Sequence, residues 1–140
     1  CLKEDVDRVL DINAKGTIMC TREVTKIMAE KGSGSVINVD SVAGEFGCGG
    51  AAYVASKGAV ISLTKHTALR FAGKGIRCNS VCPSTIVTPM TMTTDPRTLD
   101  MEMMGQMAKH ADLKVQPCMP MDVARPITGQ IIVCDYGSTL

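Results

Sequence analysis

The chain has 140 residues, of which 45% are hydrophobic and 21% are charged, and this balance is typical of one globular domain over residues 1–140. The formal net charge of +1, with acids and bases mixed along the chain, gives no electrostatic basis for binding nucleic acid or an anionic membrane. No apolar run approaches the ~18 residues that a membrane span needs, and the charged start CLKEDVDRVL is unlike a signal peptide.

The first predicted element is one long or bent helix over residues 3–31, followed by the turn KGSGS. Its apolar residues recur at helical spacing: Val6, Val9, Leu10, Ala14, Ile18, Val24, Ile27 and Met28. The β-branched run SVINV (35–39) predicts a buried strand, and DSVAGEFGCGG (40–50) predicts a glycine-rich loop.

A second long helix is predicted over residues 51–75, where GKG stops it. Its apolar positions include Val54, Val60, Ile61, Leu63, Leu69 and Phe71. The run IRCNSVC (76–82) predicts a second strand that Pro83 breaks.

The last third of the chain begins with a loop that contains three prolines, PSTIVTPMTMTTDPR (83–97), and a helix rich in methionine (99–114). A third strand is predicted over residues 129–135. Because strands alternate with long helices, we expect an α/β fold with about three parallel strands and flanking helices.

The seven cysteines form no C-x-x-C motif, and several lie in strand-like runs such as IRCNSVC and IIVCD. This placement favours reduced, buried thiols in a cytoplasmic protein. The histidines, His66 and His110, have no ligand-like spacing to the cysteines, so we expect no metal site.

Three polar features follow the predicted strands, at the edge of an open α/β sheet where ligands bind. Ser41 follows the first strand, PSTIVT follows the second, and Tyr53 and Lys57 lie early in the helix after the Ser41 loop. A helix brings residues four apart onto one face, so the Lys57 ammonium would favour the phenolate of Tyr53. A tyrosine tuned in this way can act as a general acid/base, whereas a Tyr-x-x-x-Lys pair alone also occurs by chance in helices.

The chain resembles the C-terminal half or more of a short-chain dehydrogenase/reductase along nearly its whole length. The resemblance rests on the stretches LDINAKGT, GSGSVINVDSVAG, AAYVASKGAVISLTKHTAL, GKGIRCNSVCPSTIVTPM and ITGQIIVCDYG, in this order. It implies a partial Rossmann-like, doubly wound parallel sheet and a nicotinamide cofactor, NAD or NADP.

The resemblance also implies a role for each matching residue. Asn13 matches the residue that holds a water in the proton relay, Ser41 the residue that orients the substrate, and Tyr53 the acid/base. Lys57 matches the lysine that binds the nicotinamide ribose. Four further positions match the loop that contacts the nicotinamide carboxamide and a nearby phosphate: Pro83, Ser84, Ile86 and Thr88.

The sequence departs from the family pattern at several points. No glycine-rich G-x-x-x-G-x-G turn is present, and we expect the N-terminal, cofactor-binding half to lie outside this chain. The Ser41–Tyr53 spacing is one residue shorter than usual, Asp40 replaces a frequent second serine, and Ser84 stands where glycine is usual. The segment MDVARPITGQ lacks a helix that normally separates its two ends.

The resemblance therefore implies an oxidoreductase that interconverts a secondary alcohol and a ketone on a small molecule. The alternatives are a truncated non-catalytic remnant, an oligomerisation module, or proton transfer without hydride transfer. We expect a homo-oligomer formed through helices matching roughly residues 5–30 and 52–72, and we expect these 140 residues alone not to catalyse hydride transfer.

Overall fold

The computed structural model describes residues 1–84, 86, 89, 93, 95, 97, 99–110 and 130–134. The chain begins with α1 (Lys3–Val9), continues through the π-helical segment η1 (Leu10–Lys15) and ends its first rod with α2 (Gly16–Lys31). The predicted helix over 3–31 is therefore confirmed, and its middle turn is wound more widely than an α-helix. Gly32, in the left-handed conformation, ends it.

Three strands form one parallel sheet in the order β1 (Gly34–Val39), β2 (Ile76–Pro83) and β3 (Ile131–Cys134). The register pairs Val39 with Val81, and Val81 in turn with Ile132. The predicted parallel sheet is confirmed. The predicted break at Pro83 is wrong by one residue, because Pro83 is the last residue of β2 and its missing N–H removes at most one ladder bond.

Two predicted boundaries between the first two strands are wrong. The expected loop over residues 40–50 contains a short helix, α3 (Val42–Phe46), because Ser41 caps its start. The following helix, α4 (Ala51–Arg70), ends five residues early. Gly73 and Gly75 both adopt a φ of 74°, a left-handed conformation that a helix cannot continue through.

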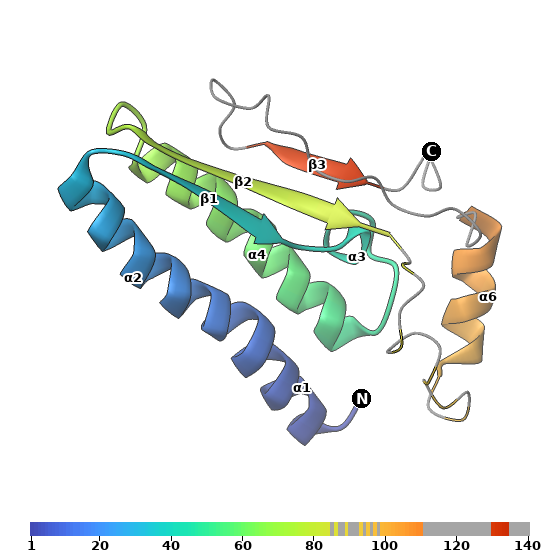
Figure 1. The fold of residues 1–140 in the computed structure, drawn as a ribbon. Coiled ribbons are helices and arrows are strands. Elements are labelled where there is room, and N and C mark those ends of the chain that lie inside the picture. The colour runs from blue at the N-terminus through green and yellow to red at the C-terminus, as the bar shows by residue number, and fades with distance from the viewer. Residues whose placement is uncertain are drawn as a thin grey trace.

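The helices α2 and α4 lie side by side on one face of the sheet (Figure 1). The helix α6 (Met101–His110), within the predicted helix 99–114, lies beyond the carboxyl ends of β1 and β2. On the opposite face of the sheet, Ile37 is 59% exposed and Val39 is 64% exposed. Within the described ranges, no helix is long and apolar enough to cross a membrane.

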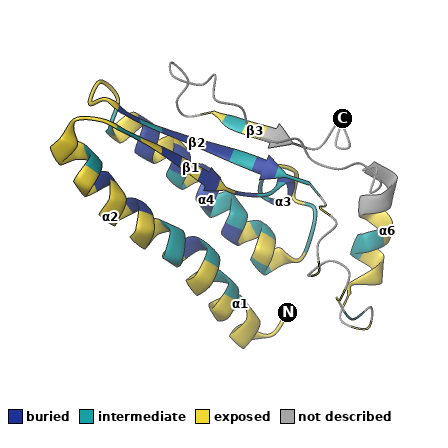
Figure 2. Ribbon diagram, in the orientation of Figure 1, coloured by how far each residue is buried: buried dark blue, intermediate teal, exposed yellow. Residues whose placement is uncertain are grey.

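The core between the sheet and the helices mixes apolar and polar side chains, as the buried inner faces in Figure 2 show. Val36, Ala68 and Cys78 form its apolar centre. Next to them, Asn38 Nδ2 donates to Thr64 Oγ1 at 2.8 Å, which satisfies both buried groups. Several apolar residues of the predicted helical stripes are instead exposed: Ile18, Val24, Ile27 and Leu69.

The predicted burial of the cysteines holds for only some of them. Cys78 and Cys82, both in the run IRCNSVC, are fully buried, and burial raises the pKa of the Cys82 thiol to about 11. Cys1 and Cys20 are exposed, and Cys48 is half-buried. The buried pair lies on a strand, whereas the exposed two lie at the chain start and on the outer side of α2.

Two glycines at the end of the α4–β2 connection provide a matched test of backbone packing. A Cβ on Gly75 would overlap the Gly32 carbonyl oxygen, whereas a Cβ on Gly73, at the same φ, would have open space. Gly73→Ala should therefore cost only the left-handed strain of about 1 kcal/mol, and Gly75→Ala roughly 1–3 kcal/mol more. Urea unfolding of both variants measures the difference, and equal losses would contradict the close approach of the two turns.

Candidate active site

Tyr53 and Lys57 lie in the first two turns of α4, next to the carboxyl end of β1. The Lys57 ammonium is 5.7 Å from the centroid of the Tyr53 ring, within the range of a cation–π contact. It also donates a hydrogen bond of 3.0 Å to the Val39 carbonyl, the last of β1. Lys57 therefore links the end of the strand to the face of the tyrosine, while Tyr53 remains 40% exposed.

Asn13 reaches the same region from a different helix. It lies in η1, and its Nδ2 donates to Ser56 Oγ at 3.1 Å. Ser56 Oγ in turn donates to the Tyr53 carbonyl at 2.7 Å. Ser56 is fully buried between the two helices, so this pair of hydrogen bonds fixes Asn13 against the turn of α4 that carries Tyr53.

Ser41 occupies the junction between β1 and α3. Its Oγ accepts the Ala43 N–H at 3.2 Å, and its carbonyl accepts the Gly44 N–H at 3.0 Å, so it caps α3. The hydroxyl proton of Ser41 is not used by this cap. The shortened connection to Tyr53 passes through Gly47 (φ 73°) and Gly49 (φ 137°), two conformations that favour glycine.

The helix α3 packs directly on α4 at Lys57. A Cβ on Gly44 would lie 2.7 Å from the Lys57 carbonyl carbon and 2.9 Å from the Gly58 nitrogen. Such distances are too short for real atoms, so only glycine permits this approach. The contact fixes the capped end of α3, and with it Ser41, relative to Lys57.

Asp40 lies between Val39 and Ser41, and its side chain is buried at 4% exposure. Neither carboxylate oxygen has a hydrogen-bond partner among the described residues. Burial raises the pKa of this carboxyl to about 6, while the Lys57 charge and the Ser41 amide oppose the rise and Glu45 adds to it. A buried acid without a partner is costly to ionise.

The end of β2 supplies the last predicted site residues. Pro83 closes the strand, and Ser84 and Ile86 follow it, with Ile86 37% exposed. The sheet aligns this end with that of β1, since the Asp40 N–H donates to the Val81 carbonyl at 2.8 Å. Thr88 lies outside the described residues.

The sequence did not single out Ser56 or Gly44. Ser56 precedes Lys57 directly, so its position on the other side of the helix from the lysine could have suggested a buried partner. Gly44 follows the predicted strand closely, but no sequence signal distinguishes it from the other glycines of that loop. Within the described part of the chain, no three His, Cys, Asp or Glu side chains group as metal ligands would.

The donors gathered here fit the ribose end of a nicotinamide cofactor. An ammonium that donates one hydrogen bond to the Val39 carbonyl and an exposed phenol can both bind hydroxyl groups, and Ser84 follows the end of the neighbouring strand β2. The same set contains no strong nucleophile paired with a base, which disfavours hydrolysis.

The two glycines at the α3–α4 contact give opposite expectations. Gly44→Ala should destabilise the fold by roughly 1–3 kcal/mol, because its Cβ meets helix backbone that cannot move aside. Gly58→Ala should be neutral or stabilise by up to ~1 kcal/mol, because its Cβ meets only the Gly44 oxygen at an ordinary 3.8 Å. Thermal or urea unfolding of both variants decides; a stable Gly44→Ala variant would contradict the contact.

The buried Asp40 predicts a specific pH dependence of stability. Its folded-state pKa lies above that of an unfolded chain, so the folded form is favoured at low pH. That stability is lost as the pH rises from about 4 to about 6, and the loss is at most about 3 kcal/mol. Asp40→Asn should remove this component and be the more stable variant at neutral pH. Urea unfolding across this pH range tests it, and an identical slope in both proteins would contradict it.

The chain is similar to known proteins along most of its length. The model of the short chain dehydrogenase family matches residues 1–98. A 3-oxoacyl-[acyl-carrier-protein] reductase of Thermotoga maritima is 36% identical, over 96% of this chain and 57% of the relative. A 3beta-hydroxysteroid dehydrogenase of Mediterraneibacter gnavus is also 36% identical, over 97% of this chain and 59% of the relative.

Solved structures show the same fold. A 3-oxoacyl-[acyl-carrier protein] reductase from Brucella melitensis matches with a TM-score of 0.79 and 26% identity, over 100% of this chain and 55% of that one. A 4-hydroxyisoleucine dehydrogenase mutant in complex with NADH and succinate matches with a TM-score of 0.77 and 31% identity, over 99% and 60%. The chain thus spans little more than half the length of these relatives. Since the family model covers most of the chain, the chain belongs to the short-chain dehydrogenase/reductase family.

Proposed function

We propose that the chain is the catalytic portion of an NAD- or NADP-dependent oxidoreductase that interconverts a secondary alcohol and a ketone. The observation that carries the proposal is the convergence of three elements on Tyr53. Lys57 joins the tyrosine to the end of β1, and Ser56 joins it to Asn13 on η1. An exposed tyrosine held by a cation and by a buried hydrogen bond is placed to exchange a proton with a ligand.

Each residue of the site then has a chemical task. The nicotinamide cofactor, when bound, supplies or accepts the hydride. The Tyr53 hydroxyl gives its proton to the carbonyl oxygen during reduction and takes it back during oxidation. The Lys57 charge stabilises the phenolate that remains, and the Ser41 hydroxyl donates to the substrate oxygen and orients it.

The remaining predicted residues hold the reactants in place. Asn13 holds a water that returns a proton to the site, a role proposed from the family resemblance. Pro83, Ser84, Ile86 and Thr88 contact the nicotinamide carboxamide and a nearby phosphate. The helix α6, in which Met103 and Met104 are half-buried, offers an adaptable apolar surface for the substrate.

The acid/base role of Tyr53 is tested by Tyr53→Phe in the longest reading frame that contains this chain. The variant keeps the ring but loses the proton, so turnover should fall by roughly 10²–10⁴-fold while cofactor binding persists. Tyr136→Phe, which changes the other tyrosine, is the matched control. Turnover in Tyr53→Phe equal to that of the control would remove Tyr53 from its role.

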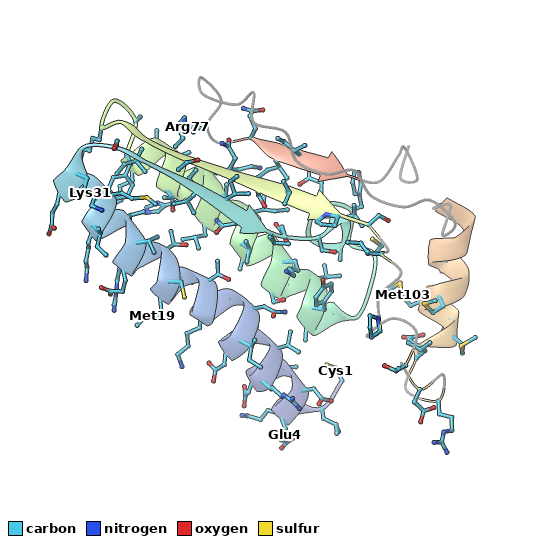
Figure 3. All side chains as sticks on the ribbon, viewed as in Figure 1. Cys1, Glu4, Met19, Lys31, Arg77 and Met103 are labelled. Atoms are coloured by element: carbon cyan, nitrogen blue, oxygen red, sulfur yellow. The ribbon has the colours of Figure 1, made fainter. Side chains whose placement is uncertain are left out.

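A second candidate, an oligomerisation module without catalysis, is favoured by the exposed apolar residues on the outer side of the helices. On η1 and α2, Ile12 is 62% exposed and Ile27 is 54% exposed, and on α4 Leu69 is 79% exposed. Met19, also on α2, points away from α4 (Figure 3). A face of this kind suits pairing with a second copy.

Two measurements on the 140-residue chain test its association and its activity in isolation. Light scattering should give a dimer or larger species, because the apolar outer face is exposed in the single chain. A monomer at micromolar concentration would contradict this.

Titration with NADH and NADPH, with assays on a panel of ketones, should show no turnover. Orientation of the reactants supplies roughly 7–11 kcal/mol of barrier reduction, and the chain lacks the glycine-rich turn that binds the cofactor pyrophosphate. Reproducible turnover would show that this portion suffices.

A further inference from the structure

Asp40 is a buried charge that the proposed reaction does not use. It is 4% exposed, and both carboxylate oxygens lack a hydrogen-bond partner among the described residues. Its backbone is held, since its N–H donates to the Val81 carbonyl at 2.8 Å. The carboxylate is therefore poorly solvated, and its charge acts strongly on charged groups near it.

Three titratable groups on three different elements are linked electrostatically to Asp40. Lys57 on α4 is the cation of the set, Glu45 on α3 is a second anion, and Cys82 on β2 is a buried thiol. The thiol stays neutral, since burial and the Asp40 charge raise its pKa to about 11. Within this group, the Lys57 charge favours ionisation of Asp40, and only the Glu45 charge opposes it.

We propose that Asp40 is a positioning residue whose carboxylate charge holds the Lys57 ammonium at the Val39 carbonyl, beside Tyr53. The inference rests on the proposed function, because that function gives Lys57 its task.

The geometry explains why this charge can act without a direct ion pair. Lys57 binds the carbonyl of Val39, so the ammonium is held at the residue that directly precedes Asp40, without a hydrogen bond to its carboxylate. The close contact of Gly44 with the Lys57 backbone holds this turn of α4 against α3, which begins two residues after Asp40. When Asp40 is protonated, the Val39 carbonyl is the one hydrogen-bond acceptor described for the ammonium. When Asp40 is ionised, its negative charge lies in a poorly solvated place, and its attraction for the ammonium adds to the effect of that hydrogen bond.

The coupling is measurable in the 140-residue chain without any turnover. Carbon NMR follows the Asp40 carboxyl, whose signal is identified by its loss in Asp40→Asn, and we expect a titration midpoint at about pH 6. Lys57→Met should raise this midpoint by about one pH unit, because a neighbouring cation favours the carboxylate. Glu45→Gln should lower it. Lys65→Met, which removes an exposed lysine two turns further along α4, should leave it unchanged.

A functional measurement completes the test in the longest reading frame that contains the chain. Asp40→Asn should shift the pH midpoint of kcat for alcohol oxidation to higher pH by about half to one unit, because an ammonium that is no longer held beside Tyr53 favours the phenolate less. A shift to lower pH would show that the Asp40 charge acts on the proton directly, and would overturn the positioning role. A structural defect would instead lower kcat equally at every pH, which would overturn the positioning role.

The two proposals fail in distinguishable ways. An Asp40 midpoint that Lys57→Met does not move overturns the inference and leaves the Tyr53→Phe result untouched. Undiminished turnover in Tyr53→Phe contradicts the proposed function, whereas the NMR shifts would still support the Asp40–Lys57 coupling.

Discussion

The contact between the Gly44 backbone and the Lys57 backbone is the constraint on which the rest of the site depends. It presses α3 against α4 at a distance that no side chain permits. One end of this contact leads through the α3 cap to Ser41 and β1, and the other leads to Tyr53 and, through Ser56, to Asn13. A single glycine thus connects the strand end, the short helix and the long helix into one rigid corner.

The interface between helices and sheet combines this rigidity with an unusual polarity. Thr21 and Thr25 are buried where a hydrophobic stripe would be expected, and Asn38 and Thr64 form a hydrogen bond inside the core. Small polar side chains let the elements approach closely and still satisfy their donors and acceptors. The larger apolar side chains are left for the outer faces, where Ile27 and Leu69 are exposed. The small polar side chains inside therefore account both for the close packing of the helices and for the apolar side chains that remain outside.

Sequence patterns predict the elements well and their faces less well. Hydrophobic spacing locates both long helices and all three strands, because helix and strand periods differ clearly. Leu69 and Ile18 belong to the apolar residues at helical spacing, yet both are exposed, because periodicity identifies an apolar face and not what covers it. The sequence predicts those parts of the site that depend on residue spacing along one helix, such as Lys57 beside Tyr53. Ser56 and the isolation of Asp40 depend on contacts between distant segments, which no local pattern contains.

The π-helical segment η1 has a consequence for the whole first rod. Residues four apart in an α-helix are rotated by about 40° around its axis at each step, so a row of such residues gradually turns away from the neighbouring helix. The wider turn over Leu10–Lys15 offsets part of this drift where η1 meets α2, and Asn13 bonds to α4 while Thr21 and Thr25 are buried further along the same rod. The segment accommodates one residue more than regular α-helical winding would, so a one-residue deletion inside it would restore that winding and leave α1 facing nearly the same way relative to α2. A chain one residue shorter within this segment therefore keeps the rotational setting of the two helices.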